Sequence, residues 1–78
     1  MSDHIRLLSD IRSNEQVEIY SIEGEGPTQH RVIEMGCTPG TPIRLIQKQA
    51  FGGPIIAMLR DAKIAIRKSD AQLIKVRS

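Results

Sequence analysis

The feature that most constrains this chain is a series of short apolar segments, each separated from the next by residues that favour turns. From Gln16 to Glu23, apolar and polar side chains alternate with the two-residue period of a half-buried strand. Later segments resemble it, and glycines such as Gly52 and Gly53 allow tight connections between them. The predicted strands are residues 16–23, 41–49, 54–60, 63–67 and 72–77. This spacing predicts a small all-β domain.

One interval departs from the strand pattern and predicts a helix. Pro27 suits the first turn of a helix, and neither glycine nor proline interrupts the chain from Thr28 to Met35. Gly36 fits the left-handed residue that follows many helix ends, with Cys37 packing back on the last turn. We therefore predict a two-turn helix, followed by a turn at Pro39-Gly40 and later by a single helical turn at Lys68 to Ala71.

The number and size of the strands favour a curled sheet. An open sheet of five short strands would leave two exposed edges, whereas a small barrel satisfies more backbone groups. The segment 54–59 is apolar on both faces, so something other than solvent must cover its outer side. We predict one domain over residues 1–78, with its core at about 7–76. We expect this domain to fold as a five-stranded SH3-like barrel with a short helical insertion between the first and second long strands.

Composition places the protein among small soluble proteins. The net charge of +2 is lower than dedicated nucleic-acid binders usually carry. The single Cys37 cannot form an internal disulfide, which fits a reducing compartment. The N-terminal residues lack a signal-peptide pattern, and the longest apolar run is far below the ~20 residues of a membrane helix. These observations predict a cytoplasmic protein that does not insert directly into a membrane.

Three motifs together resemble the FeoA family: "RVIEMGCTPGTPI" at 31–43, "AFGGPI" at 50–55 and "IAIRKSDAQLIKV" at 64–76. The similarity runs from about Leu7 to Val76. FeoA proteins are small cytoplasmic proteins of bacterial ferrous-iron uptake, and the resemblance implies an SH3-like barrel with a helical insertion. On this chain, the structural motif of the family falls on Arg31, Val32, Met35, Gly36, Pro39, Gly40, Gly52, Pro54, Arg67 and Ala71.

The resemblance implies a non-catalytic interaction module that docks on the cytoplasmic GTPase domain of the membrane transporter FeoB. Phe51 is the residue of most interest, because a large aromatic side chain at a Gly-Gly loop tip has little local chain to pack against. Two outcomes stay open: Phe51 projects toward a partner, or it folds back and plugs the barrel end. The predicted partner-binding residues are Phe51, Gly52, Gly53, Pro54 and Arg31.

The sequence gives little evidence for a metal site or for catalytic residues. His30 and Glu34 are four residues apart and can share a helix face, as metal ligands do, with Cys37 and His4 as further candidates. This ligand set is incomplete, so we assign no metal site and no cofactor, and keep a weak site for Fe(II) or another divalent ion as a candidate. Cys37 is predicted to be buried rather than reactive. No triad, carboxylate pair or phosphate loop is present, and we predict no enzyme activity.

Two alternative functions remain. The C-terminal third is basic and could contact nucleic-acid phosphates, although Tyr20 and Phe51 supply few aromatic platforms, so we predict no nucleic-acid partner. The other alternative is a metal-sensing barrel like that of iron-dependent repressors, although no pair of DNA-binding helices precedes the barrel. The cations of this third are Lys63, Arg67, Lys68, Lys75 and Arg77, against the single acid Asp70.

Overall fold

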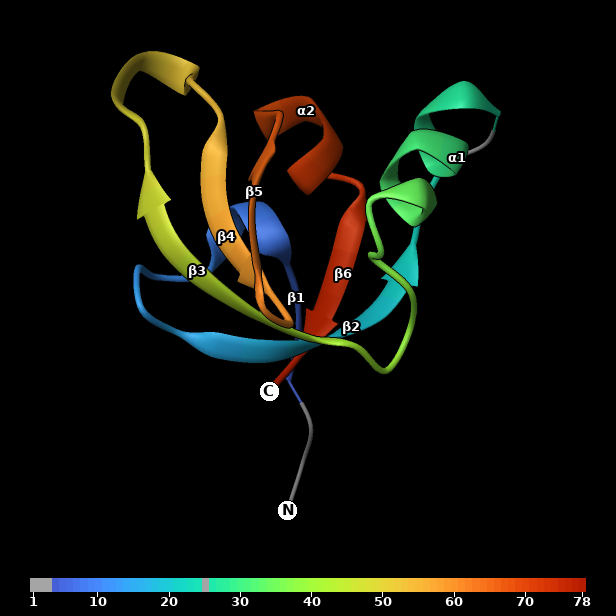
Figure 1. Cartoon of the computed structure of the whole chain (residues 1–78), viewed down its shortest axis with the longest axis horizontal. Coiled ribbons are helices and arrows are strands. Elements are labelled where there is room, and N and C mark those ends of the chain that lie inside the picture. The colour runs from blue at the N-terminus through green and yellow to red at the C-terminus, as the bar shows by residue number, and fades with distance from the viewer. Residues whose placement is uncertain (1–3, 25) are drawn as a thin grey trace.

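The computed structural model describes residues 4–24 and 26–78 of the chain. Six strands form one antiparallel sheet in the order β1-β6-β2-β3-β4-β5, and the sheet is strongly curled (Figure 1). The elements are β1 Ile5–Leu7, η1 Leu8–Asp10, β2 Gln16–Ile22, α1 Pro27–Glu34, β3 Pro42–Lys48, η2 Ala50–Gly52, β4 Ile55–Leu59, β5 Ala62–Ile66, α2 Lys68–Ala71 and β6 Ile74–Arg77.

The predicted all-β architecture is confirmed, and the helix lies between β2 and β3 as expected. The predicted number of five strands is wrong, because the structure has a sixth strand, β1. This strand has three residues and pairs with β6, so that Ile5 lies opposite Arg77 and Leu7 opposite Lys75. Its formation depends on a partner at the other end of the chain. A local sequence pattern therefore cannot reveal it.

Packing completes the barrel where the hydrogen-bonded ladder stops. Among residues 4–24 and 26–78, no ladder joins the two end strands, β1 and β5. The short helices η1 and α2 contact each other, and η1 also contacts β6. Leu8 of η1 and Ala71 of α2 are fully buried. These helical residues complete the interior that the sheet surrounds.

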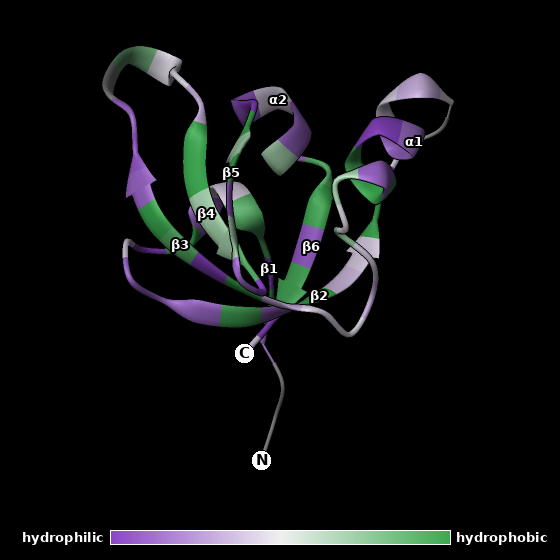
Figure 2. Cartoon of the chain, in the orientation of Figure 1, coloured by the Kyte–Doolittle hydropathy of each residue, from purple (hydrophilic) through white to green (hydrophobic). Residues whose placement is uncertain are grey.

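The core consists of inward-facing strand residues, and Figure 2 shows the resulting alternation of hydrophobic and hydrophilic segments along β3 and β6. On β4 the alternation is weaker, since Ile55, Ala57 and Leu59 are buried while Ile56 and Met58 are half-buried on the other face. The prediction that something covers this outer face is only partly met. The buried apolar residues of the strands are Val17, Ile19, Ile43, Leu45, Ile55, Ala57, Leu59, Ile66, Ile74 and Val76.

Gly36 ends α1 in the way that the sequence predicts. Its φ is 99°, and its N–H donates to the carbonyl of Ile33 at 2.9 Å. The N–H of Cys37 donates to the carbonyl of Val32 at 3.3 Å, and both side chains are fully buried. These two bonds form the Schellman arrangement. A Cβ atom at position 36 would lie 3.1 Å from Cδ2 of Leu59, so the conformation and the packing both favour glycine here.

The predicted turn at Pro39-Gly40 is also present and joins α1 to β3. The N–H of Thr41 donates to the carbonyl of Thr38 at 3.1 Å, and the two threonine hydroxyls lie 2.9 Å apart. The N–H of Gly40 donates to the carbonyl of Ile19 at 2.7 Å. This last bond attaches the turn to β2 and fixes the direction in which β3 begins.

Candidate partner-binding site

The connection between β3 and β4 carries the most exposed apolar side chain of the described residues. Phe51 has a relative exposure of 106%, whereas Ile5, Tyr20 and Ile33 range from 40% to 47%. Its backbone is left-handed, with a φ of 60°, and Gly52 follows with a φ of 77°. Of the two outcomes that the sequence left open, projection into solvent is the one observed.

Cations surround this connection. One shallow depression lies between the connection and α2, and Gly52, Pro54, Arg67 and Lys68 line it. A second depression is lined in part by Lys48, Gly53 and, again, Lys68. The Nζ atom of Lys48 donates to the carbonyl of Ser9 at 2.9 Å, which holds this side chain in place. We call Phe51, Gly52, Gly53, Pro54, Lys48, Arg67 and Lys68 the loop surface.

Arg31, the fifth predicted partner-binding residue, lies on α1, and α2 separates α1 from the β3–β4 connection in Figure 1. Its Nη2 and Nε atoms lie 2.9 and 3.3 Å from the two carboxylate oxygens of Asp70. The Asp70 side chain is only 4% exposed, against 45% for Arg31. The hydrogen bond to Asp70, with the attraction between the charges, raises the pKa of Arg31. Arg31 therefore joins α1 to α2 and is not part of the loop surface.

Asp70 is the structural residue that sequence reasoning missed. The only signal for it was its position as the single acid among the cations of the C-terminal third. The short helix α2 explains how it is placed. Arg67 precedes the helix, and its carbonyl accepts the N–H of the fully buried Ala71 at 2.9 Å. Within this single turn, Lys68 belongs to the loop surface while Asp70 contacts Arg31 of α1.

The structure does not bring the weak metal-ligand candidates together. His30 and Glu34 are exposed on α1, whereas Cys37 is fully buried, and burial raises the pKa of its thiol to about 11. His4 precedes β1, where its carbonyl accepts the N–H of Ser78 at 3.2 Å. In the part of the chain that the structure describes, no group of three His, Cys, Asp or Glu residues is arranged to hold a metal ion.

The basic C-terminal third is divided rather than continuous. Lys75 pairs with Glu23 at 3.1 Å, and Arg77 pairs with Glu18 at 2.6 Å. The guanidinium of Arg77 also lies 5.8 Å from the centre of the Tyr20 ring. Two of the five cations are thus matched by acids on or next to β2, which leaves no single basic face. Within residues 4–24 and 26–78, no helix is long and apolar enough to span a bilayer.

The FeoA domain family model matches residues 6–78. The chain is also 30% identical, over 69 residues, to an Fe(2+) transport protein A/Fe(2+) transporter FeoB fusion protein of Porphyromonas gingivalis. The chain belongs to the FeoA family. That match covers 88% of this chain but spans only 8% of the fusion protein.

Solved structures agree with this assignment. The crystal structure of a FeoA iron uptake regulatory protein has a TM-score of 0.88 at 27% identity, covering 95% of this chain and 97% of the other. FeoA of Stenotrophomonas maltophilia complexed with zinc, described as an SH3 domain protein, has a TM-score of 0.78 at 21% identity, with 91% and 88% coverage. A manganese-dependent transcriptional repressor reaches 0.88 at 20% identity, over all of this chain and 44% of the repressor. The likeness to these last two is one of fold alone, and it confirms the SH3-like architecture.

Proposed function

We propose that this FeoA domain is a non-catalytic accessory module of ferrous-iron uptake that docks on the cytoplasmic GTPase domain of FeoB. The observation that carries the choice of partner is the Porphyromonas gingivalis relative, in which transport protein A and FeoB are parts of one polypeptide. Covalent linkage holds two modules at a high effective concentration. Without that linkage, the same arrangement requires a docking surface with its own affinity.

The loop surface has the features that such docking needs. Aromatic side chains that enter a partner's pocket supply much of the binding energy at interfaces, and Phe51 is fully exposed before binding. The left-handed backbone at Phe51 and Gly52 gives the tip a defined shape. Lys48, Arg67 and Lys68 add positive charge that attracts an acidic partner surface.

The test is a calorimetric titration of the FeoB GTPase domain from the same organism with the full chain and with Phe51→Ala. We expect the substitution to weaken binding at least tenfold, about 1.4 kcal/mol, because it removes the central aromatic contact. The thermal unfolding midpoint should stay the same, since Phe51 is exposed in the free protein.

Tyr20→Ala is the matched control, because Tyr20 is an exposed aromatic residue on β2, outside the loop surface. It should bind as the unmodified chain does. Equal affinities for Phe51→Ala and the unmodified chain would refute the role of the loop surface. A GTPase domain that does not bind the unmodified chain would refute the docking itself.

A further inference from the structure

A second basic and apolar surface lies at the opposite ends of β3 and β4 from the loop surface. The strand register places Gln16 opposite Arg44, Arg44 opposite Met58, and Met58 opposite Lys63. These side chains therefore form one row across β2, β3, β4 and β5. Arg60 follows β4 in the turn to β5 and extends the row. We call Gln16, Pro42, Arg44, Met58, Arg60 and Lys63 the sheet surface.

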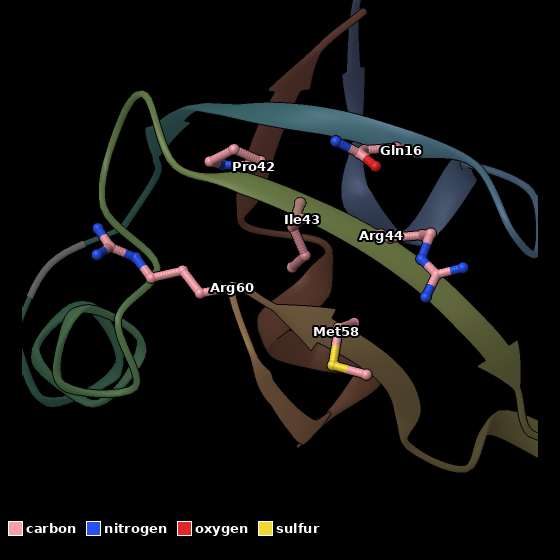
Figure 3. A pocket seen from close by; sticks show the side chains of 6 residues that line it. All are labelled: Gln16, Pro42, Ile43, Arg44, Met58 and Arg60. Carbon is pink, nitrogen blue, oxygen red and sulfur yellow. The ribbon is translucent and has the colours of Figure 1, made fainter.

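The sheet surface contains a shallow depression. Its lining residues are Gln16, Pro42, Ile43, Arg44, Met58 and Arg60. Figure 3 shows Arg44 and Arg60 on opposite sides of this depression, with Ile43 and Met58 between them. The two guanidinium groups are directed away from each other (Figure 3). A single small anion placed on one arginine is therefore badly placed for the other.

The charge of this surface is not neutralised by the chain. Arg44, Arg60 and Lys63 are exposed, and among the described residues no hydrogen bond or ion pair engages their side chains. By contrast, Arg31 and Lys75 both pair with acids. From residue 42 to residue 66 the sequence has four cations and one acid, Asp61, which adjoins Arg60 in the turn. On β2, Glu18 lies opposite Pro42, and its carboxylate pairs with Arg77 at 2.6 Å. The surface thus carries an excess of positive charge.

The centre of the surface is apolar. Met58 faces outward beside the basic side chains, and Ile56 continues the apolar strip along β4. Ile56 has Gln47 and Ala65 as its cross-strand neighbours, so no acid lies next to it in this row either. An apolar centre with a polar rim is the usual organisation of a protein interface. Methionine adapts its shape to different apolar partners.

We propose that the sheet surface binds an acidic segment of a partner protein. Carboxylates of this segment pair with Arg44 and Arg60, and an apolar side chain between them packs on Met58. The divergent guanidinium groups favour carboxylates that are spaced along a chain (Figure 3). A nucleic acid fits less well, because the surface has an apolar centre and offers no aromatic side chain for base stacking. The proposal is independent of docking to FeoB through the loop surface.

The test uses the ¹⁵N-labelled full chain and a synthetic peptide of glutamate pairs separated by single leucines. A length of about eight residues spans about 26 Å when extended, enough to cross the four strands of the row. We expect chemical-shift changes at the amides of Gln16, Arg44, Met58, Arg60 and Lys63, and none around Phe51. A peptide with lysine in place of glutamate should cause no change. Shifts centred on another face, or no shifts with the acidic peptide, would overturn the proposal.

Charge reversal separates this surface from the loop surface. The double variant Arg44→Glu/Arg60→Glu should weaken peptide binding about tenfold, whereas the matched variant Arg67→Glu/Lys68→Glu should change it less than about twofold. Equal losses in both variants would indicate attraction to net charge alone and refute the site. If the first variant does not fold, the shift map of the unmodified chain decides. If oligothymidine binds the same face more tightly than the acidic peptide does, the ligand of the sheet surface is a nucleic acid and the proposal is overturned.

Discussion

The two ends of the β3–β4 ribbon present apolar groups beside cations in different ways. At the loop surface, Phe51 extends from a connection outside the sheet, and its side chain is fully exposed. At the sheet surface, Met58 is half-buried within β4, and ladder pairing on both sides holds its backbone. A projecting aromatic side chain suits a partner that has a pocket, whereas a shallow strip between arginines suits a partner that contributes an extended segment. The two proposals together give one small barrel two docking surfaces, for two partners or for two parts of one partner.

The two ends also share a feature of the backbone. Phe51 precedes β4 with a φ of 60°, and Arg60 follows β4 with a φ of 57°. Residues other than glycine rarely adopt this conformation, and Asn is among the few that tolerate it. Each surface thus places an exposed large side chain at a position that costs folding energy, as is common where function sets the residue.

Among the substitutions that distinguish the two ends, Gly36→Ala is expected to change the free energy of unfolding most. Gly36 packs against Leu59, which lies at the sheet-surface end of β4. The positive φ costs about 1 kcal/mol for alanine, and displacement of the buried Leu59 side chain brings the total loss to about 2 kcal/mol. Urea denaturation measures this loss. The amides of the sheet surface should also shift more than those around Phe51.

Gly40→Ala is the matched control, since Gly40 has a similar φ of 91° but a Cβ added there would meet no atom within 4 Å. Gly40→Ala should lower the free energy of unfolding only by the cost of the positive φ, about 1 kcal/mol. If both alanine variants lose the same stability, the close packing of Gly36 against Leu59 does not contribute to the loss.

Phe51→Asn and Arg60→Asn are expected to change the free energy of unfolding less, and in the opposite direction. Each substitution relieves left-handed strain and should raise the free energy of unfolding by about 0.5 kcal/mol. Each should also weaken only its own surface, Phe51→Asn in GTPase binding and Arg60→Asn in peptide binding. Chemical denaturation and the two titrations check this together. If one variant loses both GTPase-domain binding and peptide binding, the two surfaces are coupled.

The smallest effect on stability concerns Cys37 in the buried core and depends on pH. Burial raises the pKa of Cys37 from 9.0 to about 11, so the folded state holds the thiol proton more tightly than the unfolded state does. The resulting stability is complete below pH 9 and is lost as the pH rises toward 11. At pH 9 the loss is about 0.4 kcal/mol relative to pH 7.

Cys37→Ala removes this contribution, so its stability should fall less between pH 7 and pH 9 than that of the unmodified chain. Comparing the two slopes isolates the contribution of Cys37, because every other ionisable group is present in both proteins. Identical slopes would mean that solvent reaches the thiol in the folded protein.

Sequence reasoning worked where the determinants are local. Pro27 and Gly36 bound α1 because the missing N–H and the positive φ are properties of single residues. The turn at Pro39-Gly40 and the helical turn before β6 follow for the same reason. The strand pattern predicted the SH3-like fold, and the FeoA motifs added the family; the comparisons confirm both.

The features that it missed depend on residues distant in sequence. Arg31 and Asp70 are separated by 39 positions, and only the packing of α1 beside α2 brings them together. The sheet surface draws on four strands, and its row exists only once their register is known. The exposure of Phe51 was undecided because it depends on the path of the whole connection. Local patterns thus predicted the elements, whereas the surfaces required the tertiary structure.

The pairing of β1 with β6 has a consequence for how this domain can be built into larger proteins. His4 and Ser78 are hydrogen-bonded neighbours, and the C-terminal end lies below the sheet in Figure 1, while the β3–β4 connection lies at its top. A linker joined to the chain next to His4 or after Ser78 therefore starts on the same side of the domain. The domain can therefore be carried as an appendage or as an insert within a host polypeptide, with Phe51 still directed outward at the opposite pole.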